Sequence, residues 1–161
     1  MSKYLKLFFV ALSLCVGAAW AGDYEDATAA LDRRDYPTAL TKFKRAAEKN
    51  DSNAQLNLGN MYHNGRGVVQ DYAEAVRWYK LAAAEGNDGT KYNLAFMYEY
   101  GTGVAQDYVR AHIWWNLAAV TGNAIAVQNR DIVAKQMTLQ QITEAQKLAR
   151  ECQARNFKNC D

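Results

Sequence analysis

The feature that most constrains the fold is a stretch of sequence that repeats itself after 36 residues. The segment from Asn57 to Val68 returns, with substitutions, as the segment from Asn93 to Val104. Further residues recur at the same offset: Asp71, Tyr72, Ala75, Trp78, Ala82, Ala83, Gly86 and Asn87 return as Asp107, Tyr108, Ala111, Trp114, Ala118, Ala119, Gly122 and Asn123. Two segments that share one period predict a stacked array of similar units.

Each unit is predicted to be a pair of α-helices. Apolar side chains follow helical spacing in residues 58–62 and again in residues 75–83. Between them stand Gly65 and Gly67, which can take the positive φ angles that end one helix and turn the chain back. Small alanines and large aromatic side chains alternate along the second helix, which is a pattern typical of closely packed helices.

The start of each second helix carries a capping signal. Asp71 is predicted to be an N-cap, and Glu74 three residues later predicts a capping box. Asp107 repeats the N-cap without the box, because Arg110 stands where the glutamate would be.

The first 21 residues have the pattern of a secretory signal peptide. Lys3 and Lys6 form a basic start, residues 5–19 are almost entirely apolar, and a small-x-small cleavage site ends at Ala21. The apolar run is about 15 residues long, which is short against the roughly 20 residues that a membrane-spanning helix needs. We therefore expect cleavage after Ala21, a periplasmic or secreted mature chain, and no stable membrane insertion after cleavage.

Two other interpretations of this segment stay open. One is an uncleaved anchor. The other is a lipoprotein signal around Cys15, although Leu14 stands where such signals carry a small residue.

The charge balance of the mature chain does not favour a nucleic-acid partner. The 19 lysines and arginines include Lys3 and Lys6, so the mature segment carries 17 basic side chains against 17 acidic ones. Nucleic-acid binding normally needs a basic surplus to neutralise phosphates. One basic cluster stands on a single predicted helix, where a solvated face is the simpler interpretation: Lys42, Lys44, Arg45 and Lys49.

The mature chain keeps two cysteines, Cys152 and Cys160, both within its last ten residues. In an oxidising compartment such a pair is expected to form a disulfide. The loop that it closes is short, so the expected stabilisation is about 2 to 3 kcal/mol. A redox-active role is the alternative, but the spacing is not Cys-x-x-Cys.

The repeated residues resemble the Sel1-like repeat, a relative of the tetratricopeptide repeat. The resemblance rests on Leu58, Gly59, Tyr62, Gly65, Gly67, Val68, Asp71, Ala75, Trp78, Ala82, Ala83 and Gly86. It implies an all-α fold, an α-α superhelix of antiparallel helix pairs. We expect one domain over residues 22–161: an atypical repeat at 22–52, full repeats at 53–87 and 88–123, and capping helices at 124–161.

The same resemblance implies a role rather than a partner. Members of the family act mostly as adaptors that hold other proteins. Some secreted, cysteine-rich members are associated with peptidoglycan-like or penicillin-like molecules, which makes a cell-wall ligand binder or weak hydrolase the alternative function. In those proteins cysteines staple each repeat, whereas the repeats of this chain contain none.

Groups that could carry out catalysis are few in the mature sequence. Ser52 is its one serine and has no Ser-x-x-Lys motif around it. His63 and His112 are far apart in sequence and lack the companions of a zinc site. His63 is expected on the polar side of a first helix, and His112 at a packed helix interface. We therefore expect no enzyme activity, no metal and no cofactor.

One set of repeated polar residues is not obviously required for packing. Asn57, Asn93 and Asn129 recur at 36-residue offsets on the first helices, which line the concave face in tetratricopeptide-like arrays. An amide both donates and accepts hydrogen bonds, so this ladder could hold the backbone of a protein or peptide partner. Weaker candidates on the same helices are Asn53, Asn60 and Lys91. The alternative is a structural role inside the array.

A set of aromatic residues could suggest carbohydrate stacking, but its helical spacing favours core packing. The set is Tyr62, Trp78, Tyr79, Tyr98, Trp114 and Trp115. The preferred hypothesis is an exported, non-enzymatic scaffold that binds a protein or peptide. A fixed structural subunit of a larger assembly is a third possibility.

Overall fold

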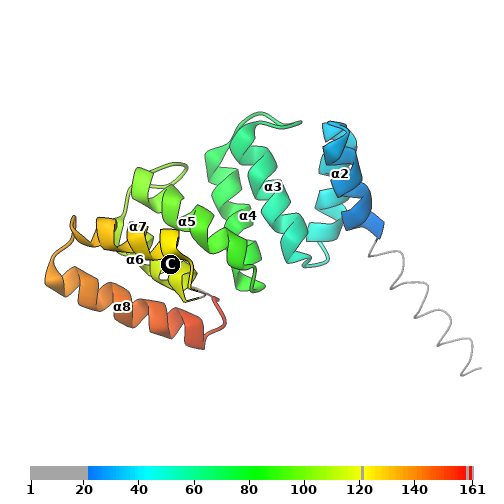
Figure 1. The fold of residues 1–161 in the computed structure, drawn as a ribbon. Helices are drawn as coiled ribbons and strands as arrows, with labels where there is room; N and C mark the ends of the chain where they lie inside the picture. Colours follow the sequence, from blue (N-terminus) through cyan, green and yellow to red (C-terminus); the bar gives the residue numbers. More distant parts are fainter. Residues whose placement is uncertain (1–21, 121, 159, 161) are drawn as a thin grey trace, which may run out of the picture.

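A computed structural model describes residues 22–120, 122–158 and 160, and these residues form helices and connecting turns without a β-strand. Figure 1 shows the helices following one another from one end of the molecule to the other. They are a helix over residues 22–32, α2 (Tyr36–Ala47), α3 (Ser52–Asn64), α4 (Tyr72–Ala84), α5 (Asp88–Tyr100), α6 (Tyr108–Ala119), α7 (Ala124–Ala134) and α8 (Leu139–Ala154). The predicted all-α solenoid is confirmed.

The predicted signal peptide lies outside the described residues. Within the described part of the chain, no helix combines the length and the apolar character that crossing a membrane requires.

The 36-residue period sets where each first helix begins. The N-caps of α3, α5 and α7 are Asp51, Asn87 and Asn123. Each side chain accepts a hydrogen bond from a backbone N–H of the first turn, two or three residues later. Because these N–H groups have no partner within the helix, the repeated polar residue fixes the start of each first helix.

The two glycines of each Gly-x-Gly turn have different structural roles. Gly65 and Gly101 end α3 and α5 in the left-handed conformation, with φ of 64° and 67°. The second glycine packs against the preceding repeat: a Cβ on Gly67 would lie 2.6 Å from that of Tyr36, and a Cβ on Gly103 would overlap the carbonyl group of Tyr72. The turn of one repeat therefore rests on the start of the previous second helix, which only glycine permits.

The predicted N-caps of the second helices are confirmed. The Asp71 carboxylate accepts a hydrogen bond from the Glu74 N–H at 2.9 Å. The Asp107 carboxylate accepts from the Arg110 N–H at the same distance.

The predicted capping box at Asp71 is wrong in its second half. The backbone N–H of Asp71 donates to the carbonyl of Tyr62 at 3.0 Å, so it does not need the Glu74 side chain. The Glu74 carboxylate instead accepts from the Arg77 guanidinium. A box does form at the start of α8, between Thr138 and Gln141.

The buried side chains form two clusters. The smaller cluster joins the helix over residues 22–32 to α2 and α3, and the larger one runs from α4 to α8. Of the aromatic residues expected in the core, four are at most 4% exposed: Tyr79, Tyr98, Trp114 and Trp115. Tyr62 and Trp78 are half-buried at the border of the clusters.

The predicted basic cluster, which lies on α2 and in the turn after it, is not simply a solvated face. The Asp23 carboxylate is buried and lies 3.3 to 3.4 Å from the nearest nitrogens of Lys42, Arg45 and Lys49. Burial alone would raise the pKa of Asp23, but hydrogen bonds from Lys49 and Lys42 and the charge of Arg45 outweigh it and hold the pKa below its ordinary value. Three of the four cations thus fasten the helix over residues 22–32 to α2 and to the turn after it.

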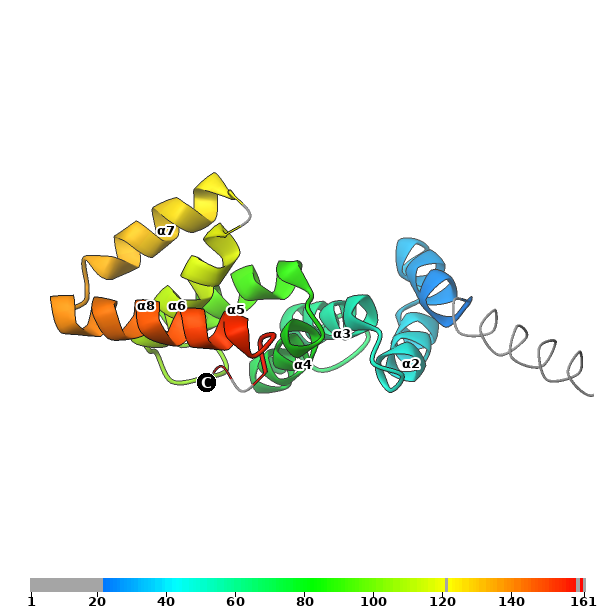
Figure 2. The same ribbon diagram turned by 90° about the horizontal axis from the view of Figure 1, so that it is seen from below.

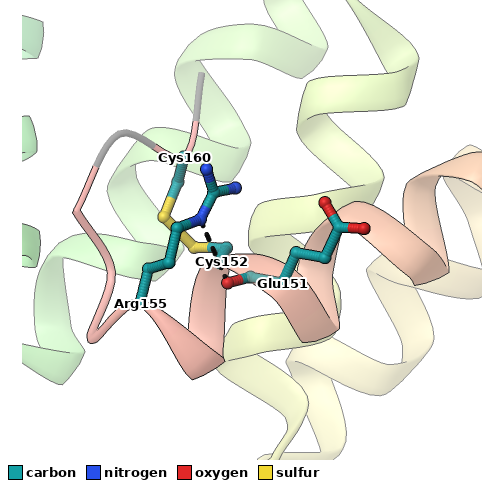
Figure 3. The surroundings of a disulfide bond; sticks show 4 residues. All are labelled: Glu151, Cys152, Arg155 and Cys160. Atoms are coloured by element: carbon teal, nitrogen blue, oxygen red, sulfur yellow. Dashed lines mark hydrogen bonds between the residues drawn. A yellow bond between two sulfur atoms is a disulfide. The ribbon is translucent and has the colours of Figure 1, made fainter.

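The C-terminal helix closes the far end of the array. Figure 2 shows α8 running back past α6, so that its last turn comes near α4 and α5. Cys152 and Cys160 form a disulfide, which holds the final loop against the end of α8, where the Arg155 side chain donates to the Glu151 carbonyl (Figure 3). Within this loop the ring of Phe157 covers the Lys91 ammonium at 3.8 Å.

Candidate functional site

The first helices of successive repeats present equivalent residues at each position. Residues three or seven apart on a helix share a face, so position 57 lies beside positions 60 and 64 in α3. We call the corresponding side chains of α3, α5 and α7 the first-helix face. It comprises Asn57, Asn60 and Asn64, then Asn93, Phe96 and Tyr100, then Asn129 and Ile132.

The Asn57 amide is already engaged within the protein. Its Nδ2 donates to the carbonyl of Asn53 at 3.0 Å and approaches the Tyr24 hydroxyl at 3.5 Å. The side chain of Asn53 is engaged too, because its oxygen accepts a hydrogen bond from Asn87 at 2.9 Å. Both asparagines therefore connect neighbouring elements of the array.

Asn93 and Asn129 differ from Asn57. Both are half-buried, and neither side chain has a hydrogen-bond partner among the described residues. The repeated asparagine position thus holds one amide with a structural role and two that keep their hydrogen-bonding groups for other partners.

A hollow of about 260 Å³ opens between α3 and α5, and two of the predicted residues, Asn60 and Asn93, border it. The wall of this hollow mixes amides with aromatic rings. The other lining residues are His63, Asn64, Tyr79, Tyr92, Phe96 and Met97.

The orientation of the Asn60 amide follows from a close helix contact. Gly59 has no side chain, and a Cβ there would overlap the ring of Tyr79. Tyr79 can therefore lie against α3 and donate its hydroxyl hydrogen to Oδ1 of Asn60 at 2.9 Å. Burial raises the pKa of Tyr79 above its ordinary value, so the hydroxyl stays a donor. With Oδ1 engaged, Asn60 is left to offer its Nδ2 hydrogens.

Lys91 lies elsewhere. Its side chain is buried, with the ammonium 2.6 Å from the Asp88 carboxylate and beneath the ring of Phe157. Lys91 belongs to α5, as Asn93 does, but the C-terminal loop covers its side chain. Lys91 is not among the residues that line the hollow, so it offers no positive charge there to a carboxylate of a partner.

Sequence reasoning missed an exposed aromatic stripe on α5. Tyr92, Phe96 and Tyr100 stand four residues apart and are 36%, 42% and 60% exposed. Phe96 and Tyr100 pack together with ring centroids 4.5 Å apart, and Tyr92 meets Trp115 edge to face. Their spacing of four residues places them on one face of a helix, but these rings do not recur in α3, so the 36-residue repeat does not single them out.

Neither histidine lies in an arrangement that indicates catalysis. His63 borders the hollow and meets the ring of Tyr72 edge to face. His112 is buried, as expected for a helix interface, and burial together with the charge of Arg130 lowers its pKa against the opposing effect of Asp131. In the described part of the chain, no three His, Cys, Asp or Glu side chains gather as a metal site would require.

Comparison with known proteins gives a family for this geometry. The Sel1 repeat model matches residues 52–87 and 91–119. A search of curated proteins found no match.

Two solved structures are similar. One is a protective antigen present in uropathogenic Escherichia coli strains that displays an SLR fold, with a TM-score of 0.79 and 28% identity over 88% of this chain. The other is a Sel1 repeat protein from Oxalobacter formigenes, with a TM-score of 0.58 and 30% identity over 61% of this chain. The present chain covers only 31% and 40% of those two chains. Residues 52–87 and 91–119 of this chain are thus Sel1 repeats, and its fold is that of solved Sel1 and SLR repeat structures.

Proposed function

We propose that this chain is an exported, non-enzymatic scaffold that binds a peptide segment of a partner protein on its first-helix face. The single observation that carries the proposal is the hollow between α3 and α5, which Asn60 and Asn93 border and where Tyr79 engages Oδ1 of Asn60 and leaves its Nδ2 hydrogens to a ligand. Amides that alternate as donors and acceptors suit the backbone of an extended peptide.

Two features support export. The first 21 residues have a signal-peptide pattern. The Cys152–Cys160 disulfide is of a kind that persists in oxidising compartments and is rare in reducing ones.

The test is affinity capture from a periplasmic extract with the mature chain as bait. The variant replaces Asn93 and Asn129 with alanine, since neither side chain holds another part of the array. Gln146→Ala, an exposed amide on α8, is the matched control. We expect the double variant to lose a partner protein that the wild type and the control both recover.

Circular dichroism must first show that the double variant melts like the wild type. Equal recovery by a folded double variant would contradict the proposed site. Purified peptidoglycan serves as a second bait: retention of the chain on it, without recovery of a protein, would favour the cell-wall alternative.

A further inference from the structure

The first-helix face contains one constant row and one variable row. Position 57 and its equivalents are asparagine in all three first helices. The neighbouring position changes from Asn60 in α3 to Phe96 in α5 and Ile132 in α7. A row that is the same in every repeat suits the part of a ligand that is the same at every residue, its backbone. A row whose residues differ from repeat to repeat suits the side chains of the ligand, which differ from residue to residue.

The variable row becomes apolar toward the C-terminal end and stays exposed. Phe96 is 42% exposed and Ile132 is 44% exposed. Tyr100 and Ile125, on the same two helices, are exposed as well. Apolar side chains gathered on one face of successive helices, rather than scattered singly, are typical of an interaction surface.

The three first helices offer no unpaired lysine or arginine to a ligand. Helix α3 contains no Asp, Glu, Lys or Arg. In α5, Lys91 pairs with Asp88, whereas the Glu99 carboxylate accepts a hydrogen bond from the neutral Trp115 indole at 2.8 Å and keeps its negative charge. In α7, the Arg130 guanidinium pairs with Asp131 at 2.8 Å.

We infer, on the basis of the proposed function, that the first-helix face selects a peptide segment with apolar anchors and without acidic side chains. The segment's backbone lies along Asn93 and Asn129, its apolar side chains lie on Phe96 and Ile132, and a polar or small residue lies at Asn60. An acidic side chain is excluded, because it would lose its hydration on this face, where Lys91 and Arg130 are already paired, without gaining a counter-charge.

The chain itself supplies matched substitutions. Asn60 occupies in α3 the position that Phe96 and Ile132 occupy in α5 and α7, so Phe96→Asn and Ile132→Asn each place a residue that the repeat already accepts there. Val69→Asn is the control, since Val69 is 89% exposed in the turn before α4 and off the first-helix face.

The probe is a displayed library of random decapeptides between glycine-serine flanks, selected on the immobilised mature chain. We expect selected sequences to be rich in aromatic and aliphatic residues and poor in Asp and Glu. For a synthetic selected peptide, Phe96→Asn and Ile132→Asn are each expected to weaken binding about tenfold, from the apolar area that each buries. Val69→Asn should leave the affinity within about twofold.

The outcomes separate this inference from the proposed function. Selected peptides that carry acidic side chains, or that bind Phe96→Asn and Ile132→Asn as tightly as the wild type, overturn the inference. Binding that still falls in Asn93→Ala keeps the scaffold function. A library that yields no binder, or binders all insensitive to Asn93→Ala, overturns the scaffold function itself.

Discussion

Gly59 shows how a single missing side chain positions the site. Because the ring of Tyr79 occupies the space of a Cβ at residue 59, Gly59→Ala must push the ring away from α3. Overpacking of this kind costs about 1 to 3 kcal/mol, of which the better helix propensity of alanine returns about 0.5 to 1 kcal/mol. We predict a net loss centred on about 1 kcal/mol, and no more than about 2.5 kcal/mol, in the free energy of unfolding measured by urea denaturation.

Tyr79→Leu provides the control for this prediction. In that background Gly59→Ala should cost much less, since the aromatic ring that it overlaps is gone. An equal cost in both backgrounds would show that the two residues do not compete for the same space.

His112 makes a second prediction at the scale of one residue. It is buried, and its Nδ1 has no partner among the described residues. Its pKa in the folded protein is below the ordinary 6.5, chiefly because of burial. The unfolded chain therefore binds more protons below that pH, so stability is complete above about pH 6.5 and falls as the pH drops through the folded pKa.

The matched variant is His112→Val, because Val76 occupies the equivalent position in α4. Melting temperatures of the wild type and His112→Val should be compared at pH 7.5 and 5.5. We expect acidification to lower the melting temperature of the wild type more than that of the variant. A parallel decrease would assign the pH dependence to other groups.

At the scale of elements, the Gly-x-Gly turns predict a difference between glycines that share a backbone conformation. Gly103 and Gly86 have φ of 74° and 86°, so alanine is strained at both. Only at Gly103 would the added Cβ overlap the preceding repeat; around Gly86 nothing lies within 4 Å. We predict that Gly103→Ala costs about 1 to 3 kcal/mol more than Gly86→Ala in urea denaturation. Equal costs would mean that the turn can move off α4.

The helices show what repeated sequence can and cannot predict. Their pairing and N-caps could be predicted, since capping depends on residues within one turn and the period places each turn. The absence of a full capping box at Asp71 could not be predicted, because the Glu74 carboxylate had two possible donors, the Asp71 N–H and the Arg77 guanidinium. It accepts from Arg77. Local patterns predict which bonds are possible, whereas competition between neighbours decides which form.

The site was predicted only in part for the same reason. The amides of Asn57 and Asn93 are indistinguishable in sequence, and they differ because Asn53 and Tyr24 reach only the first of them. Tyr24 is 33 residues away from Asn57, so no local pattern indicates this contact. Phe96 is exposed and stands where α3 has Asn60, so this candidate contact residue is marked by a difference between the repeats and not by their identity.

At the scale of the whole molecule, the two core clusters predict that the ends of the array lose stability separately. In a solenoid each repeat contacts only its neighbours, so a local change acts on nearby helices first. The Cys152–Cys160 disulfide stabilises the α4–α8 cluster by fastening the loop that carries Phe157. The Asp23 carboxylate, with Lys42, Arg45 and Lys49, fastens the opposite end.

Hydrogen exchange followed by mass spectrometry tests this separation. The Cys152→Ser, Cys160→Ser variant should lose about 2 to 3 kcal/mol and exchange faster in α8 and α5, with α2 unchanged. Asp23→Asn should accelerate exchange in residues 22–32 and α2, because the three cations lose the negative charge that they surround. The exchange rate of α8 should stay unchanged. If either variant accelerates exchange equally at both ends, the array unfolds as one cooperative unit and the two clusters share a single stability.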